Sequence, residues 1–406
     1  MHRSPRPSPP PDLKCWWFVT GRTPLVSLAE IKNVFTSSST EMIGPIVRTT
    51  FASTLSVNPS DILKRLGGTV KIGEMLAENL SESALEQTML EELQTVAGKI
   101  EFGISLYTAT DALRLGTLEQ LERWGKAIKQ KLKQAGASVR YVESREPTLS
   151  SVSVEKNGLT KRGREFLVYE EQNGLFSLAK TLAVQPFEEL GARDFGRPGR
   201  DDASGMLPPK LALMLINLTG ATTDQTLLDP FCGSGTIVTE AMLLGFKNIV
   251  GSDLSDKAVE DTRKNVAWQQ AQGANLSRVK VFQSDASELA GKLPSESIDA
   301  IAAEPYLGKP LRGSETRSML DAQIKELKQI YLDAFKAFAK ILKSGGVVVF
   351  IIPCFRYQNS WLRIDCVKEI KKCGFTVLPL LDTDEHLLYA RHGQRVGREI
   401  WRFTKN

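Results

Sequence analysis

The sequence predicts an α/β protein whose C-terminal half forms a doubly wound, seven-stranded sheet, preceded by two smaller α+β units. The main observation is a change of pattern near residue 208, after which apolar strand segments alternate strictly with helical segments. The expected strands are 226–230, 248–253, 279–285, 297–304, 346–353, 387–391 and 399–403, of which the last two form a hairpin. The expected helices are 209–218, 236–244, 256–270 and 321–342.

The N-terminal half has a less regular pattern. Residues 15–80 follow a βαβ rhythm, with strands at 15–20 and 41–53 and helices at 25–35 and 59–66, which is typical of a ferredoxin-like domain. Residues 81–185 form a second unit, with expected helices at 83–97 and 118–134 and expected strands at 99–107, 139–143, 151–154, 165–170 and 175–183. In the helix 118–134, one apolar face is expected from Leu118, Leu121, Ile128 and Leu132, and Gly136 is its expected C-cap.

Two segments lack the apolar periodicity of helices and strands and are rich in residues that interrupt them. Residues 186–207 are rich in Gly, Pro, Arg and Asp and are expected to form a linker before the domain 208–406. Residues 1–14 begin with a run rich in Pro, Ser and Arg, and we expect a disordered tail there, because such a segment buries too little surface to offset its ordering entropy.

Bulk composition excludes several classes of protein. The hydrophobic fraction of 42% and the charged fraction of 24% are those of a globular chain, and no apolar run approaches the roughly 18 residues of a membrane span. The five cysteines form no C-x-x-C pair and have no histidine at zinc-finger spacing, so we expect no metal site. Their scattered arrangement fits reduced thiols in a cytoplasmic location. The net charge of +5 is too small to prove a nucleic-acid partner by itself.

The segment Asp229-Pro-Phe-Cys-Gly-Ser-Gly-Thr236 lies where a predicted strand leads into a predicted helix. Gly233 and Gly235 allow a tight turn and close approach of a ligand, toward which the helix beginning near Thr236 directs free N–H groups. Asp229 is placed to accept a hydrogen bond from a ligand's ammonium group. Cys232 is a nucleophile by residue type alone, but its position inside this turn favours a small packed residue.

Acidic residues end the next two strands. Asp253, 18 residues after Gly235, can accept both ribose hydroxyls of an adenosine group, and Asp285 can accept the adenine amino group. A tight turn with two helix-capping aspartates is the simpler interpretation, but three acidic strand ends in register favour a ligand site. Val238 replaces the third glycine of an NAD fingerprint, and no phosphate-loop lysine follows the turn, so the expected ligand has adenosine without polyphosphate. Its expected contacts are Asp229, Pro230, Cys232, Gly233, Gly235, Thr236, Asp253, Leu254, Asp285 and Ala286.

Five segments together resemble the THUMP-containing tRNA guanine-N2 methyltransferases. They are Arg193-Asp-Phe-Gly-Arg-Pro, Ser204-Gly-Met-Leu-Pro-Pro-Lys-Leu-Ala212, Leu228-Asp-Pro-Phe-Cys-Gly-Ser-Gly-Thr236, Gly251-Ser-Asp-Leu254 and Val396-Gly-Arg-Glu-Ile400. The resemblance implies a class I (Rossmann-like) methyltransferase domain over 208–406, a THUMP-like RNA-binding domain over 81–185, S-adenosylmethionine as cofactor and tRNA as substrate. It also implies that Ser204 and Met206 approach the cofactor from the side opposite the glycine turn.

Amino methyltransferases of this group carry Asp/Asn-Pro-Pro-Tyr/Phe after the fourth strand, where the acid or amide and the first proline's carbonyl accept hydrogen bonds from the target amine. This chain has Glu304-Pro-Tyr-Leu-Gly308 instead. An ungapped alignment places Glu304 at the acidic position and Pro305 at the first proline, whereas a shifted one places Ala303 at the acid and Tyr306 at the aromatic. We prefer the first because it keeps a carboxylate, and we expect the catalytic segment to be Glu304, Pro305 and Tyr306. The simpler alternative is that Glu304-Pro305 only ends a strand.

Basic side chains indicate where RNA binds. Residues 123–142 contain six basic residues and no acidic one, and a second cluster follows at 156–164. The expected phosphate contacts are Lys126, Lys129, Lys133, Lys161, Arg162 and Arg164. A lysine stripe alone is usually the solvated side of an amphipathic helix. Arg193, Arg197 and Arg200 contact phosphate or shape the loop over the cofactor.

The resemblance implies methyl transfer to the exocyclic N2 of a tRNA guanosine, at position 10, by a monomeric catalytic chain with which a small zinc-binding activator subunit can associate. Two alternatives remain open: an amino methyltransferase acting on rRNA guanine or DNA adenine, and an RNA-binding protein with a weakened active site. The sequence leaves the choice between one and two added methyl groups open.

Overall fold

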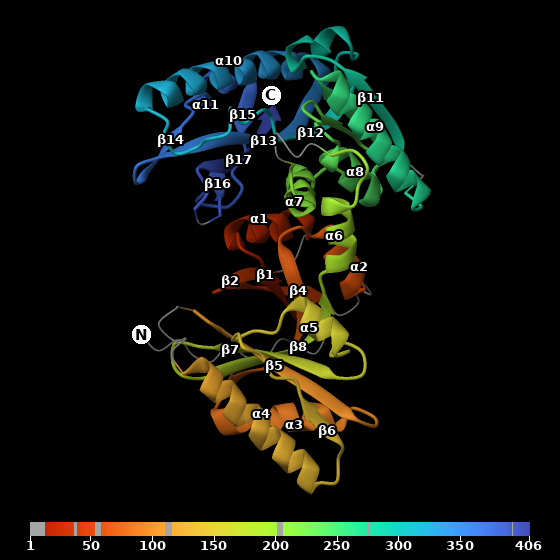
Figure 1. Cartoon of the computed structure of the whole chain (residues 1–406), viewed down its shortest axis with the longest axis vertical. Coiled ribbons are helices and arrows are strands. Elements are labelled where there is room, and N and C mark those ends of the chain that lie inside the picture. Colours follow the sequence, from red (N-terminus) through yellow and green to blue (C-terminus); the bar gives the residue numbers. More distant parts are fainter. Residues whose placement is uncertain are drawn as a thin grey trace. The chain divides into compact units, whose positions relative to one another are not determined.

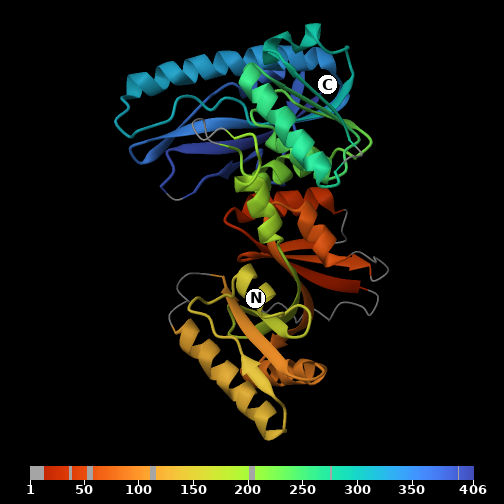
Figure 2. The same ribbon diagram turned by 45° about the vertical axis from the view of Figure 1, so that its right-hand side comes forward.

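The computed structural model describes residues 13–35, 39–52, 58–109, 116–200, 206–274, 277–391 and 393–406. The chain divides into two compact units, shown in Figures 1 and 2. Unit 1 comprises Met1–Pro24, Phe35–Arg65 and Thr69–Phe187, and unit 2 comprises Leu25–Val34, Leu66–Gly68 and Glu188–Asn406. Of the expected disordered tail, residues 1–12 lie outside the described residues, whereas residues 13 and 14 belong to the first strand, which begins earlier than predicted.

Unit 1 is built on one eight-stranded sheet in the order β2-β3-β1-β4-β8-β7-β5-β6. The strands are β1 (Leu13–Thr20), β2 (Ser39–Ile43), β3 (Ile46–Ala52), β4 (Thr69–Leu80), β5 (Ile100–Thr108), β6 (Val139–Tyr141), β7 (Arg164–Glu170) and β8 (Phe176–Val184). The helices are α2 (Pro59–Arg65), α3 (Glu82–Gln94), α4 (Thr117–Gln134) and α5 (Ser151–Lys156). Because β4 pairs with both β1 and β8, the segments 15–80 and 81–185 share this sheet.

Three predictions for unit 1 were wrong in detail. The predicted strand 151–154 is the helix α5, because the Ser150 side chain caps it by accepting the N–H of Ser153 at 3.1 Å. The predicted strand 41–53 is the hairpin of β2 and β3. On α4, Leu118 is 45% exposed, and its place in the apolar face is taken by the fully buried Trp124. The C-cap of α4 is Ala135, one residue before the predicted Gly136, whose φ of 82° is the left-handed conformation common just beyond a helix C-cap.

Unit 2 contains a nine-stranded sheet whose main path is β11-β10-β9-β12-β13-β17-β15, with β14 paired to β13 and β16 paired to β17. The strands are β9 (Thr226–Asp229), β10 (Asn248–Asp253), β11 (Arg278–Gln283), β12 (Ile298–Ala303), β13 (Leu342–Tyr357), β14 (Ser360–Arg363), β15 (Phe375–Val377), β16 (His386–Tyr389) and β17 (Val396–Lys405). The doubly wound α/β prediction is confirmed. The seven strands of the main path include β15, which was not predicted, while the predicted strand near β16 lies off this path.

Helices cover both faces of the unit 2 sheet. The helices of this unit are α1 (Pro24–Val34), α6 (Phe187–Phe195), α7 (Pro209–Thr219), α8 (Thr236–Leu243), α9 (Asp256–Ala271), the 3-10 helix η2 (Ala286–Gly291), α10 (Arg317–Ile341) and α11 (Val367–Lys372). Among them, α6 has no buried residue. One core cluster joins α1, α7 and α8 to the sheet, and the other joins α10 and η2 to it. Figures 1 and 2 show α10 running along its face of the sheet. Of the described helices, none has both the length and the apolar character needed to cross a membrane.

Phe335 shows how α10 is fixed to the sheet. Its ring contacts those of Phe350, Phe375 and Phe403 edge-on, at centroid distances of 5.2, 5.1 and 5.3 Å. With both faces packed, the parallel strands β9, β10 and β12 are held in register and present their carboxyl ends at one edge. The residue at the end of each strand is therefore brought to a common place, which is where open α/β sheets bind ligands.

Candidate functional site

The turn between β9 and α8 depends on two glycines in left-handed conformations, Gly233 with φ 52° and Gly235 with φ 82°. They differ in their surroundings. A Cβ added to Gly235 would lie 2.7 Å from Cγ2 of Thr262, so the turn packs closely against α9 there. A Cβ added to Gly233 would meet nothing within 4 Å. The Cβ position of Gly233 is therefore open, which leaves room for the ligand contact that the sequence predicts.

Two buried residues of α9 hold the turn from behind. Thr262 donates from Oγ1 to the carbonyl of Gly233 at 2.7 Å, and Asn265 donates from Nδ2 to the carbonyl of Ser234 at 2.7 Å. Neither side chain is exposed to solvent. Neither residue is among the predicted site residues; the available signal was two polar residues three positions apart on the inward face of an amphipathic helix.

Cys232 lies inside this turn, where its backbone N–H donates to the carbonyl of Ser252 at 2.9 Å. Burial raises the pKa of its thiol far above the ordinary value, and the neighbouring Asp229 carboxylate raises it further. A raised pKa disfavours the thiolate that covalent catalysis needs. The geometry agrees with the predicted role as a small packed residue.

Asp253, at the end of β10, holds the turn from the front. Its Oδ2 accepts the N–H of Gly233 at 2.9 Å and its Oδ1 accepts the N–H of Ser255 at 2.9 Å. Each carboxylate oxygen has a further lone pair, so both can still accept a ligand hydroxyl. The next residue, Leu254, is 68% exposed and offers an apolar surface beside the carboxylate.

Asp285 differs from Asp253. It is exposed and caps η2, since its Oδ1 accepts both the N–H of Ser287 at 2.8 Å and the Ser287 hydroxyl at 2.7 Å. Asp285 therefore caps a helix, as the simpler interpretation of the sequence holds. Its other oxygen remains at the carboxyl edge of the sheet, next to the buried Ala286.

Asp229 is the most buried acid of the site, only 3% exposed, and its Oδ1 accepts the N–H of Phe231 at 3.1 Å. Burial raises the pKa of this carboxyl well above its ordinary value, and the charges of Asp253 and Glu304 raise it further. The Asp229 carboxyl group therefore lies near two other acidic side chains. Such an acidic cluster favours a ligand with positive charge and disfavours a polyphosphate.

Glu304 follows β12 directly. Arg398 of β17 donates from Nε to its Oε1 at 2.5 Å. Burial raises the pKa of Glu304, and the charge and hydrogen bond of Arg398 lower it. Ala303, the last residue of β12, is fully buried and has no carboxylate. Glu304 is therefore the residue that supplies a carboxylate at the end of this strand. Arg398 lies in the motif Val396-Gly-Arg-Glu-Ile400, but it is not among the predicted site residues.

The rest of the segment presents one aromatic ring. Tyr306 is 49% exposed, and its carbonyl is fixed by the hydroxyl of Tyr331 at 2.7 Å. Pro305 is buried, and Leu307 packs partly against the core beside α7. Tyr306, rather than Leu307, is therefore the side chain that can meet a planar ligand.

The arginines before α7 brace the loop. Arg197, 4% exposed, donates from Nη1 to Oγ1 of Thr236 at 2.5 Å, and its Nη2 lies 3.1 Å from Sδ of Met206. Arg193 of α6 donates from Nε to Oε1 of the buried Glu240 at 2.7 Å. Of the two interpretations left open for Arg193 and Arg197, these contacts favour shaping of the loop. The predicted contact Ser204 lies outside the described residues.

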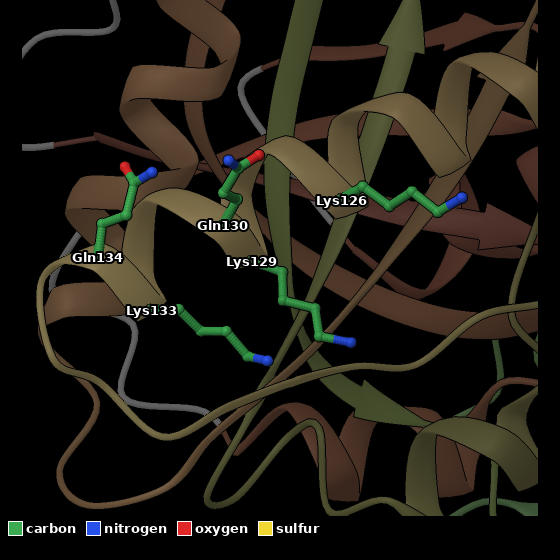
Figure 3. A pocket seen from close by; sticks show the side chains of 5 residues that line it. All are labelled: Lys126, Lys129, Gln130, Lys133 and Gln134. Atoms are coloured by element: carbon green, nitrogen blue, oxygen red, sulfur yellow. The ribbon is translucent and has the colours of Figure 1, made fainter.

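The predicted RNA contacts all belong to unit 1. Figure 3 shows Lys129 and Lys133 extending from α4 at a pocket that is also lined by Lys126. Lys126 pairs with Glu122, and Lys161 pairs with Glu155 at 3.1 Å. Arg162 is exposed. In contrast, Arg164 is partly buried, with its guanidinium bound to Glu92 at 2.8 Å.

The glycine turn after β9, with acidic side chains at the following strand ends, defines a Rossmann-like domain of the class I methyltransferase type. Residues 197–363 match the model of the UPF0020 family, described as an RMKL-like methyltransferase domain. Over 182 residues the chain is 32% identical to the tRNA (guanine(10)-N2)-dimethyltransferase of Methanothermobacter thermautotrophicus, which covers 45% of this chain and 48% of that protein. Over 172 residues it is 32% identical to the tRNA (guanine(6)-N2)-methyltransferase of Thermus thermophilus, which covers 42% of this chain and 45% of that protein.

The chain spans about half the length of the curated relatives it matches. Among solved structures, TrmN from Thermus thermophilus superposes with a TM-score of 0.55 at 19% identity, covering 97% of this chain and 100% of that one. At this identity the likeness concerns the fold. The predicted methyltransferase domain is confirmed by the family match over residues 197–363, whereas the THUMP-like domain predicted for 81–185 lies outside that match.

The two glycines of the turn are expected to respond differently to alanine. Gly235→Ala should lower the stability of unit 2 by about 2 kcal/mol or more, because a left-handed side chain costs roughly 1–2 kcal/mol and its Cβ would also press on Thr262. Gly233→Ala should cost only the conformational part, but should weaken ligand binding. Thermal unfolding of the two variants tests the difference, and a larger loss for Gly233→Ala would show that this account of the packing is wrong.

Proposed function

We propose that this chain transfers a methyl group from S-adenosylmethionine to the exocyclic N2 amine of a tRNA guanosine. The observation that carries the proposal is the carboxyl edge of the unit 2 sheet, where Asp229 and Asp253 end the parallel strands β9 and β10, Glu304 follows β12, and the Cβ position of Gly233 is open. The names of the relatives, which are tRNA guanine-N2 methyltransferases, supply the substrate.

The residues present fit this cofactor. Its ammonium and sulfonium groups are positive and would be attracted to the acidic side chains of Asp229 and Asp253, which would repel an NAD or ATP polyphosphate. Asp229 would hold the ammonium group, Asp253 both ribose hydroxyls and Asp285 the adenine amino group. Gly233 would lie against the ligand, because its Cβ position is open. When bound, the cofactor supplies a methyl group on a positively charged sulfur, which is a good leaving group.

Glu304 and the Pro305 carbonyl would hold the target amine. Oε1 of Glu304 is bound by Arg398, so we assign Oε2 to the amine N–H. The two acceptors orient the amine and direct its lone pair toward the methyl group, and rate arises chiefly from this positioning. The proton that the amine loses on methylation passes to Glu304 or to water. Tyr306, exposed on the same segment, would stack on the base extracted from the RNA.

Unit 1 would bind the RNA backbone. The ferredoxin-like segment 15–80 and the THUMP-like segment 81–185 would both belong to this RNA-binding unit. Its phosphate contacts would be Lys126, Lys129, Lys133, Lys161 and Arg162. Arg164 would support them indirectly, because Glu92 holds it. A monomeric catalytic chain in the cytoplasm, joined by a small zinc-binding activator subunit, completes the proposed assembly.

The test is to incubate the protein with S-adenosylmethionine and unmodified tRNA, digest the RNA and identify the methylated nucleoside by mass spectrometry. We expect N2-methylguanosine or N2,N2-dimethylguanosine, and mapping of the fragments then gives the position, for which 10 is the first candidate. Ribosomal RNA fragments and DNA duplexes serve as competing substrates. Methyladenosine as the product, or preferred methylation of either competitor, would contradict the proposal.

A further inference from the structure

A cavity of 540 Å³ opens in unit 2. It is lined by the loop between β12 and α10, by the turn between β13 and β14 and by the turn between β16 and β17. Three of its lining residues are arginines, Arg356, Arg391 and Arg395, and all three are exposed. The proposed methyl transfer gives this cavity no role.

The charge of the cavity is positive. Among the described residues that line the cavity, one is acidic, Glu315. The Glu315 carboxylate accepts the N–H groups of Arg312 and Gly313 at 2.5 and 2.8 Å. Those hydrogen bonds, and to a smaller extent the charge of Arg395, lower the pKa of Glu315. One carboxylate thus faces three guanidinium groups, which leaves an excess of positive charge for an anionic ligand.

Two of the guanidinium groups are placed by their surroundings. The Arg395 guanidinium lies directly over Gly313, where an added Cβ would come within 2.4 Å of its Cζ. The Arg356 guanidinium lies over the Trp361 ring, 5.6 Å from the ring centroid. Such partly ordered guanidinium groups lose less entropy when they bind a phosphate, with which they form paired hydrogen bonds.

The cavity is connected to the pair of Glu304 and Arg398 through two segments of the chain. The backbone N–H of Arg356 donates to the carbonyl of Arg395 at 2.7 Å, which joins two of the arginines through the sheet. Arg398, which binds Glu304, is three residues farther along the same chain, or about 10 Å in an extended strand. The loop that leaves Glu304 also reaches the cavity at Gly313. A strand of RNA whose base lies at Glu304 could therefore place neighbouring phosphates in the cavity.

We propose that this arginine cavity binds the phosphodiester backbone of the RNA substrate next to the methylated nucleotide. This inference rests on the proposed function and adds to it a second phosphate site, in unit 2. Extraction of a base from a stack costs a few kcal/mol, and a grip on the flanking backbone offsets part of that cost. Tyr357, which also lines the cavity, offers a ring for a neighbouring base.

The experiment compares the double variant Arg356→Gln/Arg391→Gln with Arg278→Gln, an exposed arginine of β11 at the opposite edge of the sheet. The double variant should raise the KM for tRNA by about tenfold, leave kcat and cofactor affinity within about twofold, and bind tRNA more weakly. The slope of log K for tRNA against log salt concentration should become shallower by about 1 to 2, because each lost phosphate contact contributes about 0.7–0.9.

The control should match the unaltered protein in all of these measurements. A salt slope that the double variant leaves unchanged, or one that Arg278→Gln changes equally, would overturn the inference. The result is separable from the proposed function, because RNA affinity is measured by fluorescence anisotropy without cofactor. A shallower slope in a protein that methylates no guanosine would support the phosphate site while the proposed function fails.

Discussion

Replacement of Glu304 with glutamine is expected to lower the rate of methyl transfer by about a hundredfold or more, while cofactor affinity stays within about twofold. Glutamine keeps the length of the side chain but removes the negative charge, so that the acceptor of the amine N–H is weakened. It also breaks the charged hydrogen bond to Arg398, which holds Oε1 at 2.5 Å. The measurement is the single-turnover rate at saturating tRNA and S-adenosylmethionine, with cofactor affinity determined separately by calorimetry.

Glu304→Asp is the matched control, because it keeps the carboxylate and shortens the side chain by one methylene. It should fall between the unaltered protein and Glu304→Gln, since its carboxylate is displaced from Arg398 by a distance that matters to catalytic positioning. If Glu304→Gln transferred methyl groups as fast as the unaltered protein, Glu304 would only end its strand. Glu304→Ala provides the same test with the whole carboxylate removed.

The same carboxylate determines an expected pH dependence. Burial raises the pKa of Glu304 above the ordinary 4.5, and Arg398 opposes that rise. Transfer needs the ionised form, so activity should be present above this pKa and be lost as the pH falls through it. Arg398→Gln removes the opposing charge, and the acidic limb of the pH–rate profile should therefore move to higher pH. An acidic limb that stays in place would show that the ion pair does not control the reaction.

The acidic strand ends were predictable from the sequence because their spacing is local. Each parallel strand places its last residue at the same edge, so Asp229, Asp253 and Asp285 needed only the alternation of strands and helices to be brought together. The tight turn was predictable for a similar reason, because two closely spaced glycines permit the left-handed φ that Gly233 and Gly235 adopt. The strand ends and the turn can therefore both be read from the order and spacing of residues.

Arg398 could not be predicted in the same way. It meets Glu304 only because β17 pairs antiparallel with β13, a long-range pairing that no short motif specifies. Thr262 and Asn265 likewise acquire their roles from the packing of α9 behind the turn. The prediction of a strand at 151–154 was wrong for a different reason. The two valines of this segment favour a strand, but the Ser150 side chain before them caps a helix, and this cap is the stronger signal.

Asp253→Ala is expected to weaken binding of S-adenosylmethionine by about a hundredfold or more. A carboxylate that accepts two ribose hydroxyls loses two charge-assisted hydrogen bonds, each worth roughly 1.5–3 kcal/mol. The variant also loses the acceptors of the Gly233 and Ser255 N–H groups, so the turn that faces the ligand is less ordered. Calorimetry with the cofactor and with its demethylated product measures the loss.

Asp285→Ala is the control at the neighbouring strand end. Asp285 is exposed and one of its oxygens is already occupied by Ser287, so its removal should weaken binding by about tenfold or less. A larger loss for Asp285→Ala than for Asp253→Ala would reverse the proposed orientation of the adenosine. Asp253→Asn separates the two roles of Asp253 in part, because its amide oxygen can still accept the Gly233 N–H while the Ser255 N–H loses its acceptor. If this variant is thermally more stable than Asp253→Ala but binds the cofactor as weakly, the carboxylate acts on the ligand itself.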